Sequence, residues 1–357
     1  MKRWISLLSS IMLIPSVSHA AINLTDSLSL SGFASASASK SDNEIPILQN
    51  REITEEWCFD CDSTAGLQVD WAITNALRAS AQIVKRPQDS FSSPELEWAY
   101  IAYEYESLTF RAGRLRLPLF LMSEYYYVSY AYPWFRAPQD IYDTLLGITS
   151  YDGVSVTWEG WIQDTIAVSA TPYWSTPNKD TYYTQGFDIE IDSDYITGIN
   201  VQLSYDDTLV NLSSLFSKYG GDITHVDSGS SLGEFDSEMK LFTLGIEQYL
   251  GNFHLLAEGM YSQDTYANWY ISVDYPIDSF TPYITYGQQR VRDSGEQILV
   301  GLRYDVNRYI ALNLETQFFN AKDVTGTSAL GTSYFTEAVT TGEYDANLFT
   351  AGISVAF

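Results

Sequence analysis

The stretch QILVGLRYDVNRYIALNLETQF, residues 297–318, alternates apolar and polar side chains on both sides of a short polar turn. Ile298 and Leu302 fall on one face of its first half, and Gln297 and Arg303 fall on the other. Successive side chains of a β-strand point to opposite faces, so this period of two predicts two antiparallel strands joined by a tight hairpin. A soluble protein would bury the apolar face, whereas a wide membrane barrel turns it to lipid and the polar face to water.

The same period recurs along the chain in sixteen segments of roughly ten residues, the length of a transmembrane β-strand. No segment shows a sustained helical stripe, so we expect one β-barrel domain from residue 21 to 357. The predicted strands span residues 24–38, 64–74, 77–87, 94–106, 108–117, 150–158, 163–174, 194–206, 208–219, 237–250, 252–264, 267–275, 280–291, 295–306, 309–321 and 345–357.

The connections between these segments are sorted by length. Tight turns follow the even-numbered segments, and every long connection follows an odd-numbered one. The longest span residues 39–63, 118–149, 175–193, 220–236 and 322–344. Bacterial outer-membrane barrels have this arrangement, with short periplasmic turns and long extracellular loops, whereas a soluble β-sandwich has no reason to sort its loops. The sequence therefore predicts an all-β, antiparallel transmembrane barrel of sixteen strands with both termini in the periplasm.

The first twenty residues have the features of a secretory signal peptide. Lys2 and Arg3 precede a short apolar run, and small residues stand before a cut after Ala20. That run is shorter than the roughly 20 apolar residues of a membrane-spanning helix. We therefore expect residues 1–20 to be removed on export.

Composition narrows the class of partner. The chain has 27 Tyr and 9 Trp, whose apolar rings and polar tips suit a membrane–water interface. Its net charge of −26 argues against nucleic acid, because binding phosphates requires a basic face. The two cysteines stand in CFDC, Cys58 to Cys61, and an oxidising compartment favours a disulfide between them. Half of a metal site is the alternative, but no second Cys or His pair completes it, so we expect no metal and no cofactor.

The chain resembles the porin superfamily of Gram-negative outer membranes. The resemblance rests on the signal peptide, the sixteen strands, the long loop after strand 5 and the terminal GISVAF. Ile353, Val355 and Phe357 are similar to the terminal signal that barrel-assembly machinery reads in such proteins. The loop lacks the Pro-Glu-Phe-Gly-type segment of enteric general-diffusion porins, so the resemblance does not clearly extend to that subgroup. It implies outer-membrane lipid and lipopolysaccharide as surroundings and leaves a homotrimer open.

In porins the loop after strand 5 folds inward and narrows the channel, so the resemblance makes residues 118–149 the constriction loop. The preceding TFRAGRLRLP would place Arg111, Arg114 and Arg116 on one lumen-facing wall if a bulge at Gly113 shifts the alternation, with Leu115 and Leu117 facing lipid. These arginines either create a transverse field with acidic loop residues or pair with them and pin the loop. The loop candidates for this constriction are Glu124, Asp140, Asp143 and Arg136.

The loop is also dense in aromatic residues. Tyr125, Tyr127, Tyr130 and Trp134 could stack against sugar rings, as could the neighbouring tyrosines. The alternative, which we favour, is that these rings pack the loop against the barrel interior, because an inward loop needs a small core of its own.

The residues bear on three classes of function. An outer-membrane enzyme would need a His-centred acid–base site, and neither His225 nor His254 stands in a hydrolase-like motif, so we expect no enzyme. A soluble exported binding protein conflicts with the sorted loops and with Phe357. The favoured function is a water-filled channel for passive diffusion of small hydrophilic solutes and ions. A channel biased toward sugars or small anions is the alternative, and the arginines favour mixed or mildly anionic selectivity.

Overall fold

The protein is described from a computed structural model. The predicted signal peptide, residues 1–20, lies outside the described residues and stays a prediction. The structure describes residues 21–48, 51–87, 93–144, 149–184, 187–226, 228–263, 265–291, 294–322, 334 and 343–357.

Of the eighteen strands in the described residues, all but β1 and β9 form one closed antiparallel ring, which therefore has sixteen strands. The short β1 (Ile22–Asn23) pairs with β2, and β9 (Asn178–Thr184) pairs with β10. The ring consists of β2 (Leu28–Ser41), β3 (Thr64–Ala72), β4 (Leu77–Lys85), β5 (Glu95–Tyr105), β6 (Leu108–Arg116), β7 (Ser150–Ile162), β8 (Ile166–Ser175), β10 (Phe187–Tyr205), β11 (Thr208–His225), β12 (Ser230–Leu250), β13 (Phe253–Ser262), β14 (Tyr266–Asp274), β15 (Phe280–Gln289), β16 (Ser294–Asn307), β17 (Ile310–Lys322) and β18 (Glu343–Ala356).

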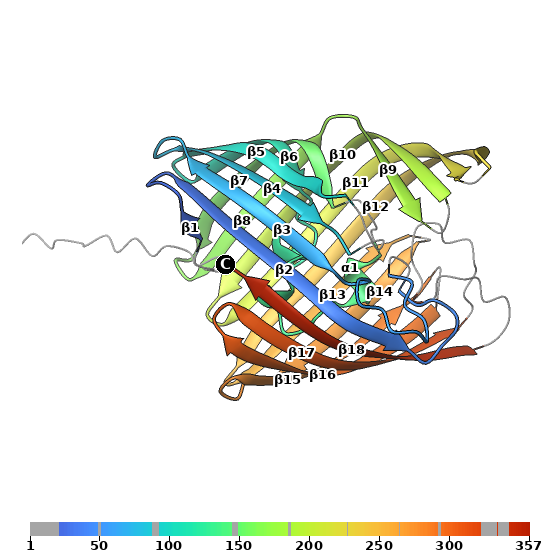
Figure 1. Ribbon diagram of the computed structural model, residues 1–357. Coiled ribbons are helices and arrows are strands. Elements are labelled where there is room, and N and C mark those ends of the chain that lie inside the picture. The colour runs from blue at the N-terminus through green and yellow to red at the C-terminus, as the bar shows by residue number, and fades with distance from the viewer. Residues whose placement is uncertain are drawn as a thin grey trace, which may run out of the picture.

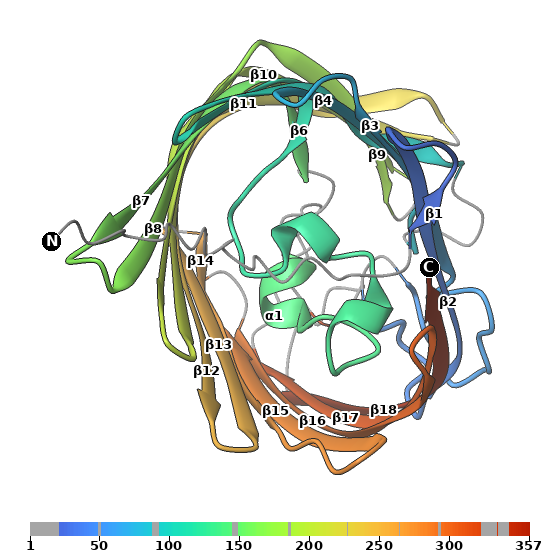
Figure 2. The same cartoon turned by 90° about the vertical axis from the view of Figure 1, so that its left-hand side faces the viewer.

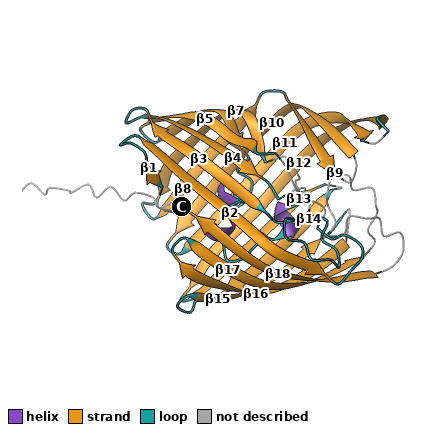
Figure 3. Cartoon of the chain, viewed as in Figure 1, coloured by secondary structure: helices purple, strands orange, loops and turns teal. Residues whose placement is uncertain are grey.

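Each of the sixteen strands coincides with a predicted segment, so the architecture read from the period of two is confirmed. Figure 1 shows short turns at one end of the barrel and longer connections at the other, and Figure 3 shows that strands make up nearly all of the wall. Several tight turns contain residues with positive φ, including Glu106, Asp206 and Gly251. Such residues suit two-residue hairpins, whose twist must match that of the flanking strands. Within the described residues, no helix is long and apolar enough to cross a membrane.

Two of the predicted long loops are wrong. Residues 175–193 contain β9 and the start of β10, and residues 220–236 are mostly the ends of β11 and β12. Backbone pairing continues through both regions, for example from Ile191 to Gly221 and from Gly220 to Asp236. These strands extend past the predicted barrel segments as tall hairpins. Their acidic residues broke the apolar alternation on which the strand prediction relied, although backbone pairing does not require an apolar face.

The two faces of the wall follow the predicted alternation. Val300 and Leu314 are 48% and 54% exposed on the outside, whereas Gln297 and Glu315 are 1% and 2% exposed on the inside. The outer residues meet lipid, and the inner residues meet water or the inward loop. Burying such polar side chains without partners would be costly, so the interior needs either water or a polar filling.

The ring closes between β18 and β2, beside the C-terminus. Phe357 donates its backbone N–H to the carbonyl of Gly32 at 2.9 Å and accepts one from Gly32 at 2.8 Å. The Phe357 ring lies over Gly32, where an added Cβ would come within 2.6 Å of Cζ. Ile353 is exposed on the outer face as predicted by the alternation. The role of Ile353, Val355 and Phe357 as an assembly signal stays a prediction.

The register at this seam also generates a prediction about the N-terminus. Phe357 lies opposite Gly32 and Ile22 lies opposite Leu30, so Ala21 falls in the one remaining position, opposite Ser31. A residue before Ala21 on the same line would meet Phe357. We therefore expect the protein isolated from outer membranes to begin at Ala21, which its intact mass and N-terminal sequencing would establish. A mature chain that retained upstream residues would contradict this expectation.

Candidate pore constriction

The loop after β6 lies inside the ring of strands. It contains two short 3-10 turns, η1 (Ser123–Tyr125) and η2 (Ser129–Ala131), and one short helix, α1 (Gln139–Tyr142). Figure 2, which looks into the barrel from the end with the short turns, shows these helical turns enclosed by the wall. Leu119, Met122, Trp134 and Ile141 are almost completely buried in a cluster shared with wall residues. The predicted inward loop is therefore present, and it has a small core of its own.

The loop docks on the inner wall at three places, which we call its seats. The first seat is the carboxylate of Glu258 on β13. It accepts hydrogen bonds from the backbone N–H of Leu121 at 2.9 Å, from the hydroxyl of Tyr142, and from the hydroxyl of Tyr270 at 2.8 Å. Gly245 on the neighbouring strand leaves room for Leu121, because an added Cβ there would lie 2.7 Å from Leu121 Cγ. The donors to Glu258 are neutral, so this contact fixes the loop without an ion pair.

A second seat receives Trp134 and Phe135. Trp134 donates its indole N–H to Thr285 at 2.7 Å, and the backbone N–H of Phe135 donates to Glu315 at 2.7 Å. The Phe135 ring lies over Gly352 on β18, where an added Cβ would come within 2.3 Å of the ring. Glycine on the inner wall is needed here for close approach of the loop.

A third seat holds α1. The side chain of Asp140 is fully buried, accepts a hydrogen bond from Gln297 at 2.9 Å and another from the Tyr334 hydroxyl, and lies against Gly287. Gln139 next to it accepts a hydrogen bond from Gln317 at 2.7 Å. Burial without a cationic partner raises the pKa of Asp140 from 3.8 to about 6.

The predicted loop residues Arg136 and Asp143 are bound by the connection between β2 and β3, residues 42–63, which we call loop 1. Arg136 pairs with Asp62 at 2.6 Å, and Asp143 pairs with Arg51 at 2.5 Å. Asp62 and Arg51 also pair with each other at 2.8 Å. Burial alone would raise the pKa of Asp62. The neighbouring guanidinium groups of Arg136 and Arg51 outweigh this effect and lower the pKa below its ordinary value. Arg136 and Asp143 therefore hold the constriction loop in place through loop 1, as Asp140 does through Gln297.

The predicted bulge at Gly113 is wrong. The pairing of β6 with β5 and with β7 runs without a register shift, so the alternation persists through Gly113. Gly113 does adopt a φ of 132°, and an added Cβ would meet the Ala99 carbonyl at 2.3 Å. The nearby register shift lies instead in the pairing of β4 with β5, where no residue of β4 stands opposite Glu97.

The arginines of β6 consequently do not form one wall. Leu115 and Leu117, expected to face lipid, are buried in the cluster with the loop. Arg114 stands opposite Ala99, two residues from the lipid-facing Ile101, and pairs with Asp152 at 3.3 Å on the outer face. Arg114 is thus outside the lumen, contrary to the prediction.

Arg116 turns back into the barrel at the end of β6. Its guanidinium pairs with Glu97 and donates to the Ser123 carbonyl of the loop at 2.8 Å. Glu97 is fully buried and also pairs with Arg86 at 3.2 Å. Arg116 therefore pins the start of the loop instead of lining a water-filled path.

Arg111 and Glu124 are the two predicted constriction residues that keep access to the remaining lumen. Arg111 is half-buried and lies over the ring of Tyr100, 5.9 Å from its centroid. Glu124 is exposed on η1 and acts electrostatically on the same Tyr100, as does Asp70 on β3. A basic and an acidic group therefore face the lumen in the neighbourhood of Tyr100.

The loop aromatics mostly pack. Trp134 is fully buried and Tyr127 is 5% exposed, with its ring 5.2 Å from the Arg116 guanidinium. Tyr125 and Tyr130 are half-buried, and the Tyr130 ring centroid lies 4.8 Å from the Arg303 guanidinium. A continuous stacking track through all four predicted rings does not exist, because two of them are enclosed.

Several residues that hold the loop were absent from the predicted set, notably Asp62, Arg51 and Glu258. Arg51 and Asp62 stand in a connection rich in acidic residues, and nothing in its composition indicates that either side chain is buried. Glu258 carries a usable signal, because it is a carboxylate at an inward position of a strand. Such a position in a barrel this wide meets either water or a loop, and the sequence alone does not distinguish them.

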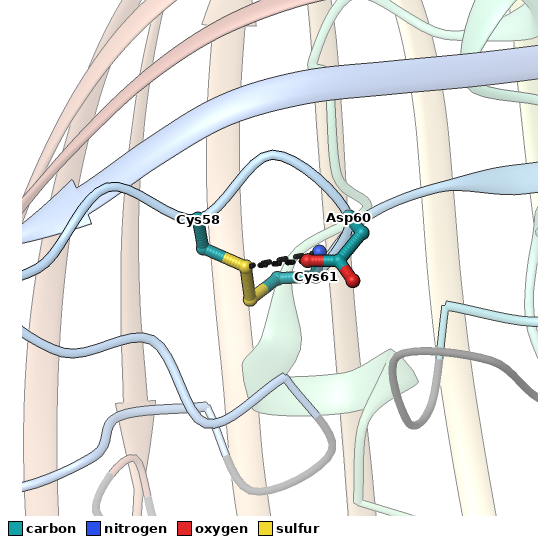
Figure 4. A group of neighbouring side chains, drawn as sticks. All are labelled: Cys58, Asp60 and Cys61. Carbon is teal, nitrogen blue, oxygen red and sulfur yellow. Dashed lines mark hydrogen bonds between the residues drawn. A yellow bond between two sulfur atoms is a disulfide. The ribbon is translucent and has the colours of Figure 1, made fainter.

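Cys58 and Cys61 are joined by a disulfide in loop 1, as Figure 4 shows. The side chains of Cys58, Asp60 and Cys61 lie near one another and superficially resemble a metal-ligand group. Metals bind the thiolate form of cysteine, and both sulfurs here are committed to the disulfide, so this group does not suit a metal.

No protein-family model and no curated protein sequence matches the chain. Several solved structures match the chain in fold. An in-vitro folded outer membrane protein of Vibrio cholerae, OmpT, is 12% identical and has a TM-score of 0.58, with 94% of this chain and 99% of that chain covered. An anion-selective porin from Comamonas acidovorans is 12% identical with a TM-score of 0.58 (93% and 99% covered). Salmonella typhi OmpF is 14% identical with a TM-score of 0.56 (92% and 97% covered).

The closed ring of sixteen strands, the outward apolar face and the inward loop define a transmembrane β-barrel of the outer-membrane type. With the structural likenesses, they show that the chain has the fold of the outer-membrane porins.

Asp140 provides a pH test of the third seat. Because its pKa is raised, the folded state binds the proton more tightly than the unfolded chain, so this stabilisation is complete below about pH 4 and is lost as pH rises through about 6. The shift corresponds to about 3 kcal/mol, at about 1.36 kcal/mol per pKa unit. We expect Asp140→Asn to be more stable relative to wild type above about pH 7 than below about pH 4.

Thermal unfolding of both proteins in detergent, followed by circular dichroism at the two pH values, measures this difference. An equal difference in Tm between variant and wild type at both pH values would contradict the raised pKa.

Proposed function

We propose that the protein is an outer-membrane porin that forms a water-filled channel for passive diffusion of small hydrophilic solutes and ions. The width of the ring supports this function, because a barrel of about 16 strands is wide enough for an aqueous channel, whereas about eight strands would be filled by side chains. The outer membrane follows from the same fold, and its lipid, lipopolysaccharide and barrel-assembly machinery are the expected partners.

The observation that carries the proposal is the polar wall beside the loop. Gln68, Asp70, Arg111 and Glu124 are only partly covered and face inward from β3, β6 and η1. Charged groups of this kind are stable in a membrane protein when they face water, and they would be expensive in a dry interior. The loop narrows this region, and the inner charges select among the solutes that pass.

The charge balance favours cations. Within the described residues, Arg111 is the one inward-facing arginine that forms no ion pair with a carboxylate. Glu124 and Asp70 in turn form no ion pair with a basic side chain among these residues. Arginines expected to line the throat are neutralised by Glu97, Asp62 or Asp152. We therefore propose a cation preference, which differs from the mixed or mildly anionic selectivity expected from the sequence. The alternative of a channel biased toward sugars or small anions has less support, because its arginines are paired.

An enzyme is the remote alternative. His254 places Nδ1 at 2.8 Å from Asp274 and Nε2 at 3.0 Å from Glu247, and its ring stacks on Tyr249. With both ring nitrogens held by carboxylates, neither is directed at a nucleophile as a general base requires. Hydrolysis of an ester or peptide by the purified protein that is abolished in His254→Ala would favour the enzyme.

A homotrimer is part of the proposal. One form of Vibrio cholerae OmpT, 13% identical to this chain, is described as a trimer, and the likeness carries that assembly here only as an expectation. Light scattering of the detergent-purified protein would measure the mass of the assembly.

Planar bilayers test the channel directly. We expect the purified protein to give stable, stepwise conductance that grows in proportion to salt concentration, because ions cross a wide aqueous path without dehydration. Protein that inserts into the bilayer but produces no conductance would refute the proposed function.

Selectivity is tested by three matched neutralisations under a salt gradient. We expect Glu124→Gln to reduce cation preference and Arg111→Gln to increase it, each by about twofold, since a unit charge at about 8 Å in water contributes about 0.5 kcal/mol. Arg114→Gln is the control, because Arg114 lies on the outer face. Reversal potentials measure all three, and a shift for Arg114→Gln equal to that for Arg111→Gln would contradict the assignment.

A further inference from the structure

Loop 1 folds into the mouth of the barrel and is itself firmly anchored. Ile47 and Ile53 are completely buried in a cluster with Phe319 on β17 and Leu348 on β18. Two backbone hydrogen bonds also join Cys58 to Ser39 on β2, at 2.8 and 2.9 Å. Loop 1 therefore rests on the wall through contacts that do not involve the constriction loop.

The disulfide stands at the point where loop 1 returns to the wall. Cys58 is paired with β2, Cys61 is bonded to Cys58, and Asp62 follows directly. The strand β3 begins two residues later, at Thr64. Asp62 is thus held on one side by a covalent turn and on the other by the start of a strand.

Most of the bonds of Asp62 come from its own neighbourhood. Its Oδ2 accepts hydrogen bonds from Ser37 at 2.8 Å and from Ser39 at 2.9 Å, both on β2, and its Oδ1 pairs with Arg51 of loop 1. The remaining partner is Arg136 of the constriction loop. Loop 1 and β2 can therefore orient the Asp62 carboxylate before the constriction loop docks.

The contact between the two loops is a buried chain of alternating charges. Asp143, Arg51, Asp62 and Arg136 follow one another as ion pairs at 2.5, 2.8 and 2.6 Å, and Glu315 on β17 lies 3.8 Å beyond Arg136. Arg136 also donates to Thr350 on β18 at 2.5 Å. Removing one member of such a chain leaves its partners buried and uncompensated, which is far more disruptive than loss of a surface pair.

The other seats of the constriction loop differ from this one. Glu258 on the wall accepts hydrogen bonds from neutral donors of the loop, and Asp140 of the loop accepts them from Gln297 on the wall and from Tyr334. The contact with loop 1 instead uses two separate ion pairs, at Arg136 and at Asp143. These two residues flank α1, so the contact fixes the half of the loop that carries the helix.

We propose that loop 1, braced by the Cys58–Cys61 disulfide, is the positioning element that holds the constriction loop in its open-channel position through Asp62 and Arg51. This inference rests on the proposed channel function. Without the ion pairs from Asp62 and Arg51, the second half of the constriction loop leaves the wall and intermittently obstructs the lumen. Asp62 and Arg51 are positioning residues, since they act on solutes only through Arg136 and Asp143.

Single-channel recording tests the proposal with Asp62→Asn, which keeps the shape of the side chain and removes its charge. We expect brief closures to become more frequent by on the order of tenfold, equivalent to about 1.4 kcal/mol, while the fully open conductance is retained. Glu56→Gln is the matched control, because Glu56 is an exposed acid of the same loop. It should close as rarely as wild type.

The disulfide is tested in a channel that has already folded. Dithiothreitol added to an inserted wild-type channel reduces the disulfide to two thiols and is itself oxidised, and closures should then become more frequent in the same recording. The same addition to Cys58→Ser/Cys61→Ser should change nothing, because that variant closes often from the start. This arm keeps the test available if Asp62→Asn fails to insert.

Closure statistics also separate positioning from general stability. A purely structural role would lower the thermal unfolding temperature without changing closures of the folded channel. Wild-type conductance with closure rates unchanged by Asp62→Asn and by reduction would overturn the loop 1 proposal alone. Wild-type protein without any conductance would overturn both this proposal and the channel function.

Discussion

The structure depends on one constraint, which is that a chain inside lipid must satisfy every backbone hydrogen bond within itself. A sheet achieves this only when its edges meet, and here β18 pairs with β2 to close the ring. Closure with sixteen strands fixes a wide interior that the side chains of the wall do not fill. The inward polar face, the inward loops and the remaining lumen all follow from that width.

A polar interior serves two purposes at once. Where no loop covers it, as at Asp70 and Arg111, it would line the water-filled path of the proposed channel. Where a loop covers it, as at Glu258 and Glu315, the same kind of side chain accepts the backbone N–H groups that an irregular segment cannot pair by itself. The loop therefore docks on a surface already suited to water, and glycines such as Gly352 provide the space for its rings.

The sequence predicted the strands and their faces because a period of two is local and repeats sixteen times. It did not predict which charges pair, because those contacts join distant segments: Arg136 and Asp62 are 74 residues apart. Arg111, Arg114 and Arg116 looked equivalent in sequence, yet an uninterrupted register sends Arg114 outward and the bulged Glu97 neutralises Arg116. The anchoring of loop 1 was not predicted, because its buried apolar residues, Ile47, Leu48 and Ile53, are few among its charges.

The central claim is that the constriction loop lies against the inner wall. Leu121→Cys combined with Gly245→Cys tests it most directly, because an added Cβ at Gly245 would lie 2.7 Å from Leu121 Cγ and disulfides join Cβ atoms about 3.5–4.5 Å apart. Peptide mapping of protein taken from outer membranes should find these two cysteines cross-linked, and should find none in Leu121→Cys/Ile246→Cys, whose second cysteine faces outward. Free thiols at both positions of the first variant would contradict the account.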